Sequence, residues 1–145
     1  MAIWKRQFAS PTMEALIGAL PKDRQAGMET VRAWLAEHTK TRPELAYVDS
    51  SWCWCERYVL KEPGVGDLCE VCLIPDPERA RVGISCQRHF FEKHDMRSLP
   101  RSVQAELGEG VCVGHLAWTE CGVGSATEAQ GVCDLLRIIM GLEQV

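Results

Sequence analysis

Cysteine is the residue type that most suggests chemistry in this 145-residue chain, which contains eight of them. Two pairs are closely spaced, Cys53 with Cys55 and Cys69 with Cys72. Thiolates at such short separations are typical ligands of a tetrahedral zinc ion. Side chains alternate between the two faces of an extended strand, so Cys69 and Cys72 lie on opposite faces whereas Cys53 and Cys55 share one. Cys53 and Cys55 are therefore the candidate thiolate ligands, with packed small side chains as the alternative.

A second candidate metal site combines imidazole and carboxylate groups. His89, Glu92, His94 and Asp95 lie within seven residues and could bind zinc or iron. In a helix, His89 and Glu92 lie on the same side, but His94 lies about 140° around the axis from His89. We therefore expect any zinc or iron ligands in this segment to be His89 and Glu92, and a solvated polar face is the alternative.

Tryptophans mark a candidate ligand surface. Trp52 and Trp54 share one face of the first strand predicted below, and Trp118 shares a face of the fourth with Glu120. We expect these two strands to form an aromatic surface with an acidic tip, suited to a flat or cationic small molecule. The alternative is that the indoles seal the sheet against helices.

Helices are predicted at both ends of the chain. Ser10 and Pro11 are typical of a helix start, and apolar residues follow at helical spacing up to Pro21. A second amphipathic helix is predicted over 22–38. Near the end, a capping box at Ser125 precedes an apolar stripe formed by Val132, Leu135, Leu136, Ile139 and Met140.

Strands are predicted between these helices. Runs rich in aromatic, β-branched and other apolar residues cover 51–60, 67–74, 80–86 and 111–121, and the first three are separated by proline-containing turns. An irregular, partly helical crossing is predicted over 92–106. The sequence thus predicts one α+β domain over residues 1–145, with an antiparallel sheet of about 4–6 strands. The two N-terminal helices and the C-terminal helix pack on one face of that sheet, and the other face is open.

Several segments resemble a known family when read in order. They are MEALIGALP (13–21), PEL (43–45), LIP (73–75), WTE (118–120) and LLRII (135–139). Their order resembles the YdhG-like proteins and related small domains of unknown function. This resemblance implies a small cytoplasmic α+β domain with some frataxin-like, iron-handling relatives. Basic and acidic residues intersperse through residue 49, however, a mixture that would not concentrate iron.

Composition limits the function classes. With 46% hydrophobic and 25% charged residues, the chain matches ordinary globular proteins rather than disordered ones. A net charge of −4 argues against a general nucleic-acid-coating protein. No export signal or membrane span is visible, so we expect a cytoplasmic protein with mostly free thiols.

These observations favour a monomer or homodimer that binds a small molecule or a protein partner on the open sheet face. The alternative is a metal-handling protein that uses frataxin-like iron ligands or thiolate-bound zinc. An enzyme of unknown reaction is a third possibility, for which the sequence supplies no specific catalytic motif.

Overall fold

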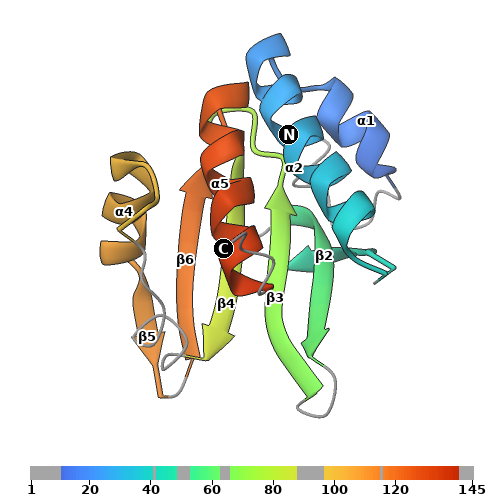
Figure 1. Ribbon diagram of the computed structural model, residues 1–145. Coiled ribbons are helices and arrows are strands. Elements are labelled where there is room, and N and C mark those ends of the chain that lie inside the picture. Colours follow the sequence, from blue (N-terminus) through green and yellow to red (C-terminus); the bar gives the residue numbers. More distant parts are fainter. Residues whose placement is uncertain are drawn as a thin grey trace.

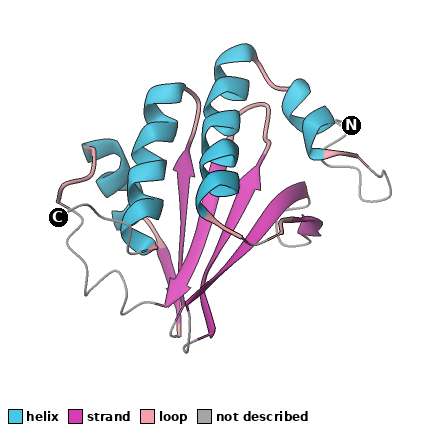
Figure 2. Cartoon of the chain, turned by 45° about the vertical axis from the view of Figure 1, so that its right-hand side comes forward, coloured by secondary structure: helices cyan, strands magenta, loops and turns pink. Residues whose placement is uncertain are grey.

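The computed structural model describes residues 11–40, 42–48, 53–62, 66–87, 97–114 and 116–140. Within them, six strands form one antiparallel sheet and the helices lie together on one side of it (Figure 1). Figure 2 shows the same two layers from another angle, with the helices above the sheet. The predicted α+β class is confirmed, including the two N-terminal helices and the C-terminal helix.

Four helices are described, namely α1 (Met13–Gly18), α2 (Lys22–His38), α4 (Arg101–Gly108) and α5 (Ala126–Ile139). The α1 helix begins after Thr12 rather than after Ser10, the expected cap. Thr12 is the N-cap, and its side chain accepts a hydrogen bond from the Ala15 N–H at 3.1 Å. Ser125 caps α5 as predicted, accepting from the Glu128 N–H at 3.2 Å. Residues 92–96 of the predicted crossing lie outside the described residues, and its described part leads into α4, which starts directly after Pro100.

The strands are β1 (Glu44–Val48), β2 (Cys53–Glu62), β3 (Gly66–Ile74), β4 (Arg81–Gln87), β5 (Val111–Val113) and β6 (Leu116–Gly122). Their order across the sheet is β1-β2-β3-β4-β6-β5. The meander of β2, β3 and β4 matches the prediction. Two differences were not predicted: β1 pairs with β2, and the expected fourth strand is a hairpin of β5 and β6 that turns at Gly114, where φ is +61°.

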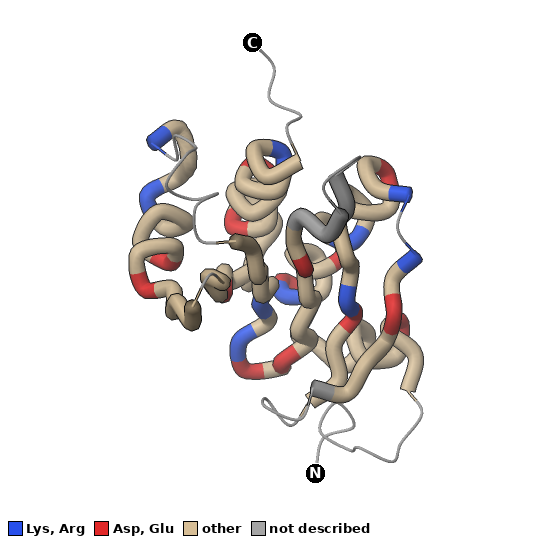
Figure 3. The backbone as a smooth tube through the Cα atoms, turned by 90° about the horizontal axis from the view of Figure 1, so that it is seen from below, with Lys and Arg blue, Asp and Glu red and all other residues tan. Residues whose placement is uncertain are grey.

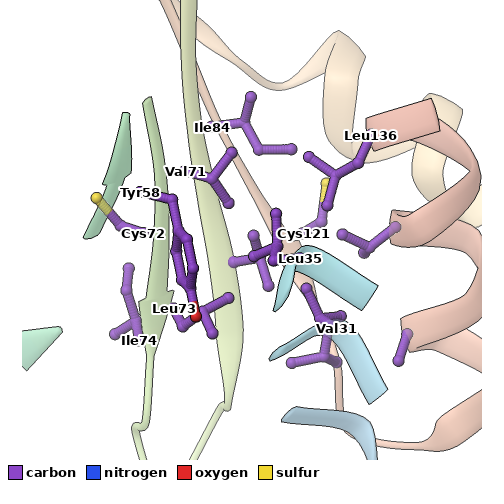
Figure 4. Close-up of a cluster of buried hydrophobic side chains, with 14 of the residues drawn as sticks. Val31, Leu35, Tyr58, Val71, Cys72, Leu73, Ile74, Ile84, Cys121 and Leu136 are labelled. Carbon is purple, nitrogen blue, oxygen red and sulfur yellow. The ribbon is translucent and has the colours of Figure 1, made fainter. Parts of the chain in front are cut away.

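The strand register separates the two faces of the sheet. Directly opposed residues of neighbouring strands share a face, and the Val71–Ile84 pair faces the helices. Figure 4 shows Val71 and Ile84 directed toward Leu35 of α2 and Leu136 of α5, whereas Cys72 lies on the far side of its strand. We call the covered side the helix face and the opposite side the second face.

Helix-face side chains form the core with α2 and α5. Val31, Leu35, Val71, Ile84 and Leu136 are all fully buried. At about 25 cal/mol per Å² of apolar surface removed from water, a core of this kind supplies most of the free energy that favours folding. Figure 3 shows that basic and acidic positions are interspersed over the described helices and strands. None of the helices in the described parts of the chain is both long enough and apolar enough to span a bilayer.

Candidate functional site

The predicted aromatic surface is not formed, because Trp54 and Trp118 lie on opposite faces of the sheet. Register pairs link Glu56 of β2 through Leu73 and Val82 to Cys121 of β6. Even-numbered positions of β2 therefore share a face with odd-numbered positions of β6. The prediction that these two strands present their indoles on one surface is wrong. Strand periodicity fixes the faces within each strand, but only the register relates one strand to another.

Each predicted member of that surface has a separate environment. Trp54 lies on the helix face and makes an edge contact with Tyr47 of β1, with ring centroids 5.6 Å apart. Trp118 lies on the second face, as does Glu120. The Glu120 carboxylate pairs with the Arg81 guanidinium at 2.9 Å, so its charge is already compensated. Trp52 lies outside the described residues.

Trp118 belongs instead to an apolar group at the edge of the sheet. Its cross-strand partner is Val111, and Val113 is paired with Leu116, so all four side chains lie on the second face. Three of them are strongly exposed: Val111 at 59%, Val113 at 75% and Leu116 at 54%. We call these four residues the edge patch. Large apolar side chains are normally buried, so a group of them exposed together is typical of an interaction site.

Among the strands that the structure describes, the β5 strand that carries half of this patch has a neighbour on one side only. Natural sheets protect such edges with charged residues, proline or bulges. The other edge strand, β1, follows that rule, because Glu44 forms an ion pair with Arg57 at 3.2 Å. In contrast, β5 consists of the uncharged residues Val111, Cys112 and Val113, all of them exposed.

The edge patch was not predicted from the sequence, because residues 111–121 were expected to form one continuous strand. In a continuous strand, the alternation of side chains would have placed Val113 together with His115 and Ala117. The available signal was the pair of glycines, Gly110 and Gly114, that bracket β5. A glycine inside a strand-like run is typical of a turn or a bulge.

The thiols of the second face form a separate group. Cys53 and Cys55 share this face and Cys69 and Cys72 lie on opposite faces, both as predicted. Cys53, Cys55 and Cys72 are buried. A hydrogen bond with Cys72, together with burial, raises the pKa of the Cys55 thiol, and the same contact lowers the pKa of Cys72.

An ionic group borders these thiols. Arg81 donates to Asp76 at 2.8 Å and to Glu120 at 2.9 Å, and its side chain is only 15% exposed. Burial is the largest influence on Cys53 and raises the pKa of its thiol, while the charge of Arg81 acts in the opposite direction. The two ion pairs compensate the mostly buried charge of Arg81 beside these thiols.

Metal-binding geometry is not found among the described residues: no three His, Cys, Asp or Glu side chains there converge as ligands would. Cys53 and Cys55 are thus brought to one face without a third ligand from the described parts of the chain. His89 and Glu92, the other predicted ligands, lie outside those parts.

A buried ion pair on the helix face was also missed. Glu56 of β2 accepts two hydrogen bonds from Arg32 of α2, at 2.9 and 3.0 Å, and a third from the Tyr58 hydroxyl at 2.5 Å. These donors compensate a carboxylate that is 4% exposed. Burial is the largest cause that raises the pKa of Tyr58, and its bond to Glu56 adds to the effect. This group joins α2 to the sheet and is structural in character.

Comparison of the chain with protein-family models, with curated proteins and with solved structures found no match.

Proposed function

We propose that this protein is a binding module whose ligand is an extended segment of a partner protein. The segment pairs with the free edge of β5 and lays alternate side chains on the edge patch. The observation that carries the proposal is that Val111 and Val113 of the edge strand β5 and Leu116 of the adjoining β6 are exposed together on one face of the sheet.

The exposure of these residues favours a protein segment over a small molecule. Sites for small molecules are concave and enclose most of the ligand surface. Side chains that are 54% to 75% exposed line no such enclosure. An extended peptide needs none, because the free N–H and C=O groups of an edge strand supply affinity and every second side chain supplies specificity.

The lack of charge on β5 sets the chemistry of the partner. No charged side chain lies between Gly110 and Gly114, so the strand offers nothing that selects a charged segment. Trp118, with its indole half-buried beside Val111, provides the largest apolar contact. The matching ligand is a short strand whose alternate residues are apolar or aromatic.

Selection of displayed random peptides on the purified protein tests this proposal. We expect enriched peptides to show alternate apolar residues, and their binding to slow hydrogen exchange at the β5 amides. Val113→Lys should weaken the selected peptides at least about tenfold, because it puts a charge into the contact. Ala36→Lys, which adds the same charge to an exposed position of α2, should leave affinity unchanged.

Val113 is largely exposed, so its replacement should leave the fold intact, as far-ultraviolet circular dichroism can verify. The proposal fails if no peptide is enriched. It also fails if the selected peptides bind the Val113→Lys and unmodified proteins equally well.

A further inference from the structure

Two thiols face each other directly across the centre of the sheet. Cys69 of β3 and Cys86 of β4 are register partners on the helix face. They are 3% and 2% exposed. Their cross-strand neighbours on that face, Leu60 on β2 and Ala117 on β6, cannot ionise and offer no alternative partner for either sulfur.

The register gives this pair the backbone spacing of a disulfide. Directly opposed residues of an antiparallel pair have Cα atoms about 4.5 or 5.5 Å apart. A disulfide needs about 4.4–6.8 Å between Cα atoms, and either type of pair falls in that range. Its Cβ atoms must be about 3.5–4.5 Å apart, against about 4.5–5.5 Å in opposed pairs, so the two side chains must move slightly closer together. A hydrogen bond with the Cys86 side chain, followed by burial, raises the pKa of the Cys69 thiol. The Cys69 sulfur also donates to the backbone carbonyl of Glu70 at 3.6 Å, a bond that it would give up on forming a disulfide.

A second thiol pair on the other face does not meet the same condition. Cys72 is the register partner of Arg57, so Cys55 is two residues away from the opposed position. Diagonal neighbours of this kind are about 7–8 Å apart, outside the range that a disulfide spans. The chain thus contains its own control, a pair of buried thiols on neighbouring strands whose register does not fit a disulfide.

We propose that Cys69 and Cys86 are a site of reversible oxidation, at which a hydroperoxide converts the two thiols into a cross-strand disulfide. Oxidation requires access to a thiolate, so hydrogen peroxide, which is small and uncharged, reacts with this buried pair during local opening of the two strands.

The reaction balances with one peroxide per disulfide. The thiolate of one cysteine attacks a peroxide oxygen, the O–O bond breaks, and the sulfur becomes a sulfenic acid as the leaving hydroxide takes a proton to form water. The second thiol loses its proton and attacks the sulfenyl sulfur. An S–S bond forms, and the expelled hydroxide leaves as a second water. The two sulfurs lose two electrons, which reduce the peroxide.

The cross-link ties together β3 and β4, the two strands that lie at the middle of the sheet. Because it closes a loop in the unfolded chain, the disulfide raises resistance to denaturant, and a reductant reverses the effect. The free energy of unfolding of the protein would then depend on whether its surroundings are oxidising or reducing.

The test uses the full chain with Cys112→Ser, which removes the exposed thiol. After treatment with limiting hydrogen peroxide, intact mass and non-reducing peptide mapping identify the bonds formed. We expect a loss of about 2 Da and a linked peptide pair containing Cys69 and Cys86. The urea midpoint should rise on oxidation and return to its original value after treatment with a phosphine reductant. The same treatment in concentrated urea should scatter the linkages over other cysteines.

Two further variants complete the design. Cys86→Ala should abolish the mass loss, whereas Cys72→Ala, which removes a similarly buried thiol from the other face, should retain the Cys69–Cys86 link. The proposal is overturned if native protein links Cys55 to Cys72, or forms no link between Cys69 and Cys86. Peptide mapping of the Cys112→Ser protein decides this even if Cys86→Ala fails to fold.

Discussion

The indole of Trp118 lies directly over Gly83 on the neighbouring strand. A Cβ atom at position 83 would come within 2.2 Å of Cη2 and 2.4 Å of Cζ2 of that ring. Such distances are far below van der Waals contact, so only glycine leaves room for this rotamer. The half-buried position of Trp118 in the edge patch therefore depends on a missing side chain in β4.

Gly83→Ala should displace the Trp118 indole from its seat. We expect the free energy of unfolding to fall by about 1–3 kcal/mol, because the ring must leave its rotamer or the strands must shift. Urea unfolding measures the loss of stability. The fluorescence of Trp118→Phe identifies the signal of this indole, so that its displacement in Gly83→Ala can be recognised.

Gly18→Ala is the matched control, since no atom lies within 4 Å of the Cβ position there. Gly18 is in α1, where alanine is favoured over glycine by up to about 1 kcal/mol, so this variant should be neutral or more stable. Equal destabilisation by both substitutions would contradict the contact between Trp118 and Gly83.

Glu56→Gln should weaken the attachment of α2 to the sheet. The substitution removes the charge that compensates Arg32 in a mostly buried setting, and breaking such a pair costs about 3–5 kcal/mol. Glu14 binds the same guanidinium at 3.0 Å but its side chain is 71% exposed, so solvent screens the pair and Glu14→Gln should cost much less than Glu56→Gln. Chemical denaturation of both variants gives the comparison, and similar losses would show that burial does not matter here.

One thiol should be distinguishable from the other seven in the native protein. Cys112 is exposed, whereas Cys53, Cys55, Cys69, Cys72, Cys86, Cys121 and Cys133 are buried. We expect Ellman's reagent to modify one thiol rapidly and the rest only after unfolding, because reaction requires an accessible thiolate. Cys112→Ser should eliminate the rapid phase. A second fast thiol in that variant would contradict the burial of the others.

Stability should fall in alkaline solution. Burial raises the pKa of Cys133 to about 11 and that of Cys121 to about 12, from an ordinary value of 9.0. Between pH 9 and 11 the unfolded chain loses protons that the folded chain retains, so the free energy of unfolding decreases as pH rises. Below pH 9 both states keep these protons, and the two thiols add no pH dependence.

Urea midpoints measured from pH 8 to 11 test this dependence. Cys133→Ala should reduce the slope above pH 9, since it removes one of the buried thiols. Cys112→Ser should leave the slope unchanged because its side chain is exposed. Parallel curves for all three proteins would contradict the role of the buried thiols.

Features that depend only on neighbouring residues in the sequence were predicted correctly. The Ser125 capping box, the meander of β2 to β4 and the opposite placement of Cys69 and Cys72 follow from spacing alone. The relation between Trp54 and Trp118 depends on a register that passes through two intervening strands, and no local pattern specifies it.

Contacts between distant segments could not be predicted from the sequence either. Arg32 and Glu56 look like ordinary solvated charges, on a helix and on a strand, until α2 packs against β2. The β5 strand has only three residues, which is too short for a periodic signal. The edge patch could not be predicted, because it depends on the hairpin at Gly114 that divides the expected strand into β5 and β6.

The insertion of β6 between β4 and β5 has a consequence for folding kinetics. The hairpins of the meander need only short loops to close, but β6 reaches β4 after an excursion from Gln87 to Leu116. Closing that longer loop carries a greater entropic barrier, so β6 should dock late and make the slow step. Until then, β4 is itself an open edge, and a chain emerging from the ribosome exposes it for as long as β6 is still being synthesised.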